Sequence, residues 1–145
     1  GHSCTDTGRI NDWRLGESIV LGCETLNRTQ IAGLHTDAIT LVAEVIESKT
    51  KSSVPTGIIG QDAFGGKQTF EDRGNINHAI LAVGRQDVLI SGLITDQLHI
   101  LGASSDHLIV DSRRQRLRVG EEVKFSLTYG ALLAAMTSPF VKKNI

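Results

Sequence analysis

Apolar and polar residues alternate from Asp37 onward, and this is the clearest regular pattern in the chain. The apolar members stand at every second position: Ile39, Leu41, Ala43 and Val45. A period of two places such side chains on one face of an extended chain. The pattern therefore predicts a half-buried strand of about ten residues. We expect the polar run at 48–53 to form the turn that ends this strand.

Two apolar runs, 98–101 and 107–110, flank a turn of small and polar residues at 102–106. Both runs are short and rich in branched residues, which favours strands over a helix. Small residues allow a tight turn, and Asp106 can accept a hydrogen bond from the backbone beside it. Two interpretations stay open. The turn either joins two core strands with no further role, or it directs Ser105 and Asp106 into a ligand site.

Other segments also have the character of strands. The apolar run at 78–84 predicts a strand that is buried on both faces, and the apolar residues Val123, Phe125 and Leu127 predict one that is buried on a single face. Pro and Gly within 54–60 restrict that segment to an edge or bulged strand. We expect a further short strand at 67–71.

Helix signals occur near both ends of the chain. Strong helix formers at 129–136, followed by a Ser-Pro pair, predict a short C-terminal helix. Gly16 followed by Glu17 suits the first turn of another helix, and 24–36 has the composition of a linker. With roughly seven or eight short strands and one terminal helix, the chain is predicted to form an all-β barrel or sandwich.

The composition is that of an ordinary globular domain. The chain has 145 residues, of which 40% are apolar and 21% charged, and its net charge is −1. This balance gives no bulk attraction to nucleic acid, and no apolar run approaches the roughly 20 residues that span a bilayer. Because Cys4 and Cys23 form no disulfide framework, we expect free thiols and a cytoplasmic location.

The residues offer little reactive chemistry by themselves. The five histidines are scattered and neither cysteine has a close thiol partner, so we predict no metal site. His99 and His107 stand on apolar runs, which favours core or rim positions. The segment Arg113–Arg118 carries four arginines without aromatic residues, which indicates a solvated hairpin tip rather than a polyanion site.

Six segments, taken in order along the chain, resemble the C-terminal part of the ornithine racemase-like branch of the alanine racemase family. They lie at 14–22, 62–65, 70–74, 83–87, 101–107 and 129–139. The resemblance implies a small closed, Greek-key-like barrel with a short C-terminal helix, as in the C-terminal domain of alanine racemases. It also implies a racemase that depends on pyridoxal 5'-phosphate, with an upstream barrel that supplies the lysine bonded to the cofactor.

The same resemblance assigns cofactor contacts to four residues. Arg14 matches an arginine that faces the pyridine nitrogen, where a guanidinium does not transfer its proton to the ring, so the ring stays neutral. Gly16 and Glu17 match positions whose backbone N–H groups hold the cofactor phosphate. Tyr129, the only tyrosine of the chain, matches a tyrosine that donates to that phosphate. Without the resemblance, Arg14 would be interpreted as a surface residue and Tyr129 as a half-buried core residue.

The substrate entrance is expected to involve four other residues. Ser105 and Asp106 match a Met-Asp pair that one subunit of a dimer contributes to the pocket of its partner, so Ser makes this pocket more polar. Arg85 and Asp87 match a tyrosine and an aspartate near the same entrance. The resemblance thus implies a homodimer that acts on a small amino acid.

The largest departure from the family concerns the second catalytic base. Alanine racemases use a tyrosine of the β domain there, and the corresponding segment 57–65 contains no tyrosine. Asp62 could act as the base instead, or it could bind a cationic side chain such as that of ornithine. We therefore expect Asp62 to lie in the active site of the whole enzyme.

These expectations divide the chain in two. Residues 1–36 would form the end of the N-terminal cofactor-binding barrel and a linker, and residues 37–145 the C-terminal β-barrel domain. Such a segment would be inactive without the barrel and its lysine. A competing interpretation is a non-catalytic β barrel that serves as a docking module through Arg113–Arg118. A decarboxylase of the same fold type is disfavoured by the 103–106 segment.

Overall fold

The computed structural model describes Asp12, residues 15–54 and residues 72–144. The chain divides into two compact units, residues 1–40 and residues 41–145. In the described parts of the chain, no helix combines the length and the apolar character needed to cross a membrane.

The first unit contains one short helix, α1 (Glu17–Leu21), which confirms the helix expected after Gly16. Gly22 ends it in the left-handed conformation, with φ of 69°. Such a backbone suits glycine, which has no Cβ to clash. The following residues, 23–36, form turns and an isolated β-bridge between Cys23 and Gln30.

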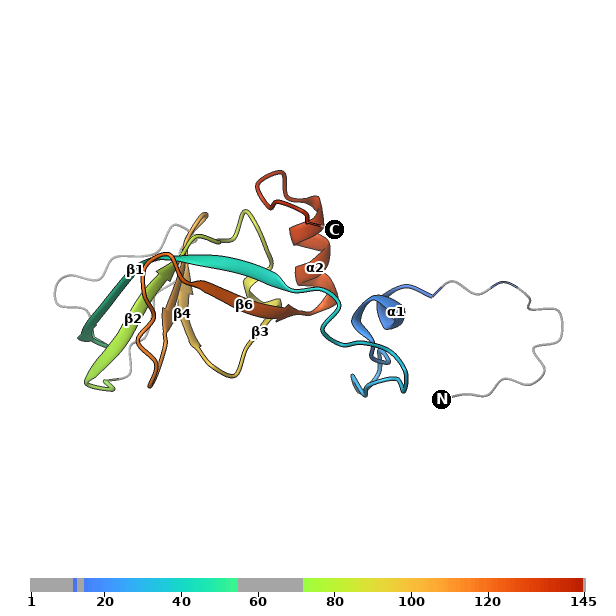
Figure 1. Ribbon diagram of the computed structural model, residues 1–145, viewed down its shortest axis with the longest axis horizontal. Coiled ribbons are helices and arrows are strands. Elements are labelled where there is room, and N and C mark those ends of the chain that lie inside the picture. The colour runs from blue at the N-terminus through green and yellow to red at the C-terminus, as the bar shows by residue number, and fades with distance from the viewer. Residues whose placement is uncertain (1–11, 13–14, 55–71, 145) are drawn as a thin grey trace. The chain divides into compact units, whose positions relative to one another are not determined.

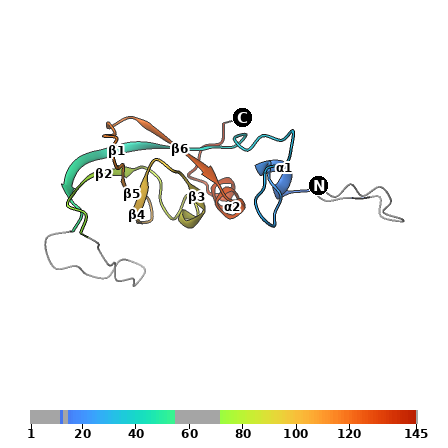
Figure 2. The same cartoon turned by 90° about the horizontal axis from the view of Figure 1, so that it is seen from below.

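The second unit is built on one antiparallel sheet of six strands, in the order β3-β6-β1-β2-β5-β4 (Figure 1). The strands are β1 (Leu41–Ser52), β2 (Asn75–Leu81), β3 (Leu93–Ile94), β4 (His99–Ala103), β5 (Leu108–Asp111) and β6 (Glu122–Leu127). The sheet curls into a half-barrel, as a view turned by 90° shows (Figure 2). The predicted all-β, barrel-like fold is therefore confirmed.

Strand β1 is the longest of the six strands and pairs with two different strands along its length. Its first residues pair with β6, and from Val45 onward it pairs with β2. The register shifts between Val45 and Glu47, as at a β-bulge, and a bulge bends a strand. The predicted alternation is confirmed, because Leu41, Ala43 and Val45 are buried.

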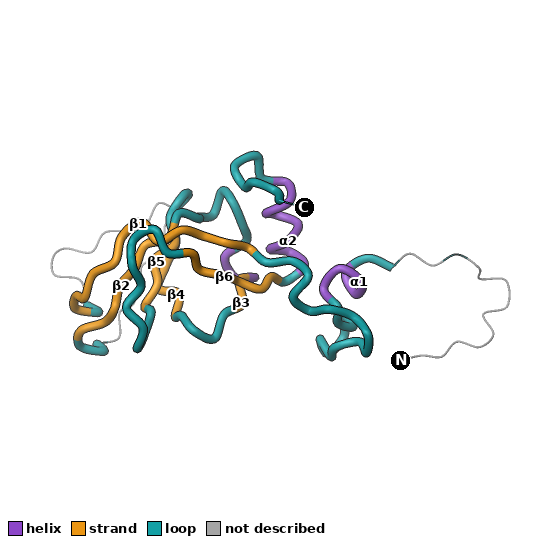
Figure 3. Tube along the Cα trace, viewed as in Figure 1, coloured by secondary structure: helices purple, strands orange, loops and turns teal. Residues whose placement is uncertain are grey.

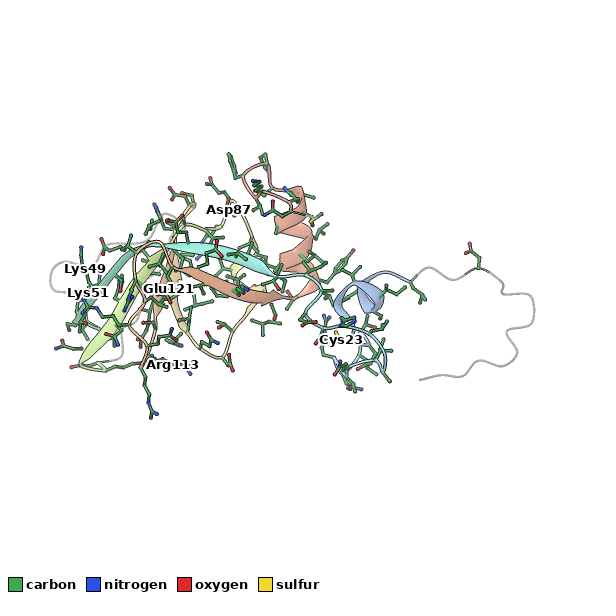
Figure 4. All side chains as sticks on the ribbon, in the orientation of Figure 1. Cys23, Lys49, Lys51, Asp87, Arg113 and Glu121 are labelled. Atoms are coloured by element: carbon green, nitrogen blue, oxygen red, sulfur yellow. The ribbon has the colours of Figure 1, made fainter. Side chains whose placement is uncertain are left out.

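The turn expected at 48–53 is wrong, since β1 continues through Ser52 and begins at Leu41 rather than Asp37. Polar side chains do not prevent a strand when a neighbouring strand satisfies its backbone. Here Ser48 pairs with Ala79 and Lys49 pairs with His78 on β2. The side chains of Lys49 and Lys51 project from this end of β1 (Figure 4).

The core is built mainly from aliphatic side chains of the sheet. Six large side chains are almost wholly buried, from β1, β2, β5, β6 and the segment after β2: Val45, Leu81, Val88, Leu108, Val110 and Phe125. Strand β6 alternates buried and exposed residues, as predicted from Val123, Phe125 and Leu127. Aliphatic residues dominate because the chain has few aromatic ones.

The predicted hairpin around 102–106 is confirmed, since β4 and β5 pair with Ala103 opposite Leu108. The segment Arg113–Arg118 is not a hairpin tip, however. It connects β5 to β6, which are separated in the sheet by β1 and β2. Six strands are described, and the strands expected at 54–60 and 67–71 fall largely outside the described residues.

The predicted C-terminal helix is confirmed as α2 (Tyr129–Thr137), which ends before the Ser-Pro pair (Figure 3). Thr128 caps its N-terminus, because the Oγ1 atom accepts a hydrogen bond from the N–H of Ala131. The helix packs on η1 (Ile90–Gly92), a single turn of 3₁₀ helix. A Cβ at Gly92 would overlap Thr128, so glycine permits this close approach.

Candidate functional site

Two turns of the second unit are joined through their backbones. One follows β2 and includes Gly84 to Val88, and the other joins β4 to β5 and includes Ser104 to His107. The N–H of Arg85 donates to the carbonyl of Ser104 at 3.0 Å, and that of Gln86 donates to the carbonyl of Ser105 at 2.8 Å. We call this pair the docked turns.

Gly84 sets how closely the docked turns approach. A Cβ at this position would overlap the carbonyl of Ser105 and the backbone nitrogen of Asp106. Glycine has no Cβ and therefore avoids this clash. The glycine that ends the apolar run 78–84 thus has a structural role. Sequence reasoning did not assign a role to Gly84 or Gln86. The glycine directly after the predicted strand was the available signal.

Asp87 stabilises the first of these turns. Its Oδ2 atom accepts a hydrogen bond from the N–H of Gly84 at 2.8 Å, and its own N–H donates to the carbonyl of Gly84 at 3.1 Å. The residue is buried, in the loop between β2 and η1 (Figure 4). A buried carboxylate that accepts a backbone donor holds the loop in shape. Within this geometry Asp87 is a positioning residue.

Asp106 presents a carboxylate at the surface of the second turn. Its Oδ1 atom accepts from the hydroxyls of Ser104 and Ser105, each at 3.1 Å, and lies 3.2 Å from Nδ1 of His107. The hydroxyl of Ser105, that of Ser104 and the neighbouring His107 hold the pKa of Asp106 below its ordinary value. Asp106 therefore stays ionised to lower pH than an isolated aspartate.

Arg85 extends from the first turn toward the second. Its Nε atom donates to the carbonyl of Ala103 at 3.1 Å. The structure thus brings together all four residues predicted for the entrance: Arg85, Asp87, Ser105 and Asp106. The two adjacent turns therefore carry a guanidinium and a carboxylate, which are groups able to bind an anion and a cation, respectively.

The residues predicted to contact the cofactor phosphate lie on both units. Gly16 precedes α1, and within its unit no atom comes within 4 Å of the position that a Cβ would take. The carboxylate of Glu17 accepts from Arg28, which fixes this negative charge on a cation of the same unit. Tyr129 is the first residue of α2, and 43% of it is exposed.

Three of the predicted sites involve residues outside the docked turns. Arg14 and Asp62 fall outside the described residues, so their contacts stay predictions. The arginines at 113–118 follow β5, and a surface hollow is lined by Ser48, Arg116, Leu117, Arg118 and Val119. In the described part of the chain, no three His, Cys, Asp or Glu side chains are placed to hold a metal ion.

Comparison with known proteins identifies relatives but no family model or solved structure that matches. Ornithine racemase of Acetoanaerobium sticklandii is 46% identical over 140 residues, which are 94% of this chain and 40% of that racemase. Lysine racemase of Thermotoga maritima is 47% identical over 137 residues, which are 92% of this chain and 39% of that racemase.

The chain is therefore a homologue of amino acid racemases. More narrowly, it is related to ornithine racemase and lysine racemase, and it spans about 40% of the length of these curated relatives.

Replacing Gly84 with alanine should separate the docked turns. We expect Gly84→Ala to lower the free energy of unfolding by roughly 1–3 kcal/mol, the usual cost of overpacking. Denaturant unfolding measures this change. Gln86→Ala is the matched control, because Gln86 is exposed and the variant keeps the backbone N–H that donates to the carbonyl of Ser105. Equal stability of the two variants would contradict the role given to Gly84.

The pKa of Asp106 should depend on the serine hydroxyls. Ser105→Ala removes the largest contribution to the depressed pKa of Asp106. We therefore expect that pKa to rise toward the ordinary aspartate value in an NMR titration of the carboxyl carbon. A depressed pKa adds stability above the unfolded pKa, and this stability is lost as the pH falls through the folded pKa. Ser91→Ala, at an exposed site in η1, should leave the pKa of Asp106 unchanged.

Proposed function

We propose that this chain is the C-terminal β domain, with the end of the preceding barrel, of a pyridoxal phosphate-dependent amino acid racemase. The observation that carries the proposal is 46–47% identity to ornithine racemase and lysine racemase over more than nine-tenths of the chain. The substrate class is a small or basic amino acid, and the reaction is removal of the Cα proton on one face and its return on the other.

The division of the chain supports this assignment. Residues 1–36 would belong to the N-terminal barrel and linker, and residues 37–145 to the β domain. The compact units 1–40 and 41–145 have their boundary close to this point. The barrel would supply the lysine that binds the cofactor, so the segment alone would be inactive.

The residues of this chain fit a phosphate group chemically. Backbone N–H groups at the start of α1 have no partner within the helix, so those of Gly16 and Glu17 can donate to phosphate oxygens. The exposed phenol of Tyr129 offers an O–H donor. Arg28 already neutralises the carboxylate of Glu17, which reduces its repulsion of an anion. When bound, pyridoxal phosphate supplies an electron sink for the carbanion formed at Cα.

Each remaining residue would have a defined task. Arg14 would face the pyridine nitrogen of the cofactor without giving it a proton. Arg85 would bind the substrate carboxylate, and Asp106 would bind an ammonium group at the entrance, with Ser105 holding Asp106 ionised. Asp87 would keep the entrance turn in shape. In a homodimer these turns would complete the pocket of the partner subunit, and the enzyme would work in the cytoplasm.

The function is tested on the protein expressed from the entire reading frame. We expect it to show the visible absorption band of a lysine-bound pyridoxal phosphate, and to interconvert the enantiomers of ornithine or lysine faster than those of alanine and serine. Chiral chromatography measures each rate. A full-length protein that binds pyridoxal phosphate but racemises none of these amino acids would overturn the proposal.

The second catalytic group is tested by Asp62→Asn in the same full-length protein. If Asp62 moves the Cα proton, we expect kcat/KM to fall by roughly 10²–10⁴-fold. If it binds the side-chain ammonium, KM should rise for ornithine and lysine but not for alanine. Asp37→Asn changes a carboxyl group that is 88% exposed and serves as the control. Unchanged kcat and KM for all substrates would exclude Asp62 from the site.

A further inference from the structure

Helix α2 is apolar on two opposite sides and contains no charged residue. One side is buried against the sheet and η1, through Ala131, Leu132 and Ala135. A helix at the surface of a globular protein normally carries charged or polar residues on its outer side. A helix that is apolar all round is expected to be covered all round.

The outer side of α2 presents large side chains in one stripe. Tyr129, Leu133 and Met136 follow the i, i+4, i+7 spacing of a single helix face, and 43%, 53% and 56% of them are exposed, respectively. They stand opposite the small side chains of Ala131 and Ala135, which lie toward the sheet. Three neighbouring large apolar residues form a contiguous patch, unlike the single exposed residues found on most surfaces.

Leu89 adds to this stripe from the preceding loop. It is 49% exposed, and its Cδ2 atom lies 3.1 Å from the position that a Cβ of Gly130 would take. Glycine at position 130 therefore lets Leu89 lie against the helix. We call Leu89, Tyr129, Leu133 and Met136 the outer α2 surface.

The outer α2 surface is connected to the docked turns by a short length of chain. Leu89 comes two residues after Asp87, whose carboxylate holds the entrance turn. The segment from Gly84 to Gly92 thus runs from the docked turns to the contact with α2. At that contact Gly92 lies close to Thr128, and the carbonyl of Gly92 accepts a hydrogen bond from the N–H of Thr128. A body that covers Leu89 would therefore contact the same loop that carries Asp87.

We infer that the outer α2 surface docks onto the remainder of the racemase polypeptide. This inference rests on the proposed function. The two curated relatives extend well beyond the match, since only 40% and 39% of their lengths correspond to this chain. The remaining part of each relative is large enough to cover a helix face. An uncharged and largely apolar surface suits a permanent contact within one chain, because permanent interfaces are more hydrophobic than transient ones.

The test uses Met136 as a reporter in the full-length protein. A covered methionine is oxidised by peroxide only when the contact opens. We expect Met136 to react roughly tenfold more slowly in the native protein than in the same protein unfolded in guanidinium. Val119→Met provides a second reporter at a position that is 65% exposed and away from α2, and it should react rapidly. Peptide mass spectrometry measures both rates.

A variant pair tests the surface itself. Leu133→Lys places a charge in the centre of the outer α2 surface, and we expect Met136 to become rapidly oxidised. Val119→Lys adds the same charge elsewhere and should leave Met136 protected. Rapid oxidation of Met136 in the unmodified full-length protein would overturn the inference. So would protection that disappears on dilution to the monomer, because a second copy would then be the cover.

The outcome is separable from that of the proposed function. A full-length protein that racemises ornithine or lysine while Met136 reacts rapidly would retain the function and refute the docking surface. A protein with a protected Met136 that binds pyridoxal phosphate without racemising any of the four amino acids would support the docking surface and refute the function.

Discussion

The fold of the second unit depends on one residue position where β1 changes partners. Val45 is fully buried, its N–H donates to the carbonyl of Glu121, and its carbonyl accepts from Gly120. The same residue pairs with Leu81 on β2. Both neighbouring strands therefore meet β1 at the bend. This arrangement places β3, β6 and α2 along one part of the curl, and β2, β5 and β4 along the other.

The candidate entrance is a consequence of this arrangement. The first docked turn follows β2 directly, and the second joins the two strands that extend the sheet beyond β2. Backbone groups hold the turns together, so the side chains of Arg85, Ser105 and Asp106 stay at the surface. The strands thus present these polar side chains on their connecting loops, which is where binding residues are commonly found.

Local patterns predicted local structure well. The alternation at 41–45, the hairpin around Asp106 and the helix from Tyr129 each depend on neighbouring residues, and all three were correct. The polar half of β1 was missed because pairing with β2, a distant segment, stabilises it. The path of 113–118 was also misjudged, since its hairpin character depended on which strands become neighbours. The spacing of apolar residues along the chain does not indicate which distant strands pair with one another.

The site shows the same division between local and distant information. Resemblance to a family grouped Arg85, Asp87, Ser105 and Asp106, and the structure brings them together. The resemblance gave no indication that the carboxylate of Asp87 accepts a hydrogen bond from the N–H of Gly84, because that bond depends on the shape of the turn. The predictions for Arg14 and Asp62 remain predictions, since those residues lie outside the described parts of the chain.

Because main-chain atoms join the two turns, the residues that hold the turns together differ from those that set the character of their surface. The carbonyls of Ser104 and Ser105 would be present with any side chain at those positions, so the turns do not depend on serine for their attachment. A substitution at Ser105 can therefore alter charge and size at this surface while both main-chain hydrogen bonds between the turns remain. A change at Gly84 or Asp87, by contrast, would act on the turn itself, because Gly84 permits the close approach and Asp87 accepts the N–H of Gly84.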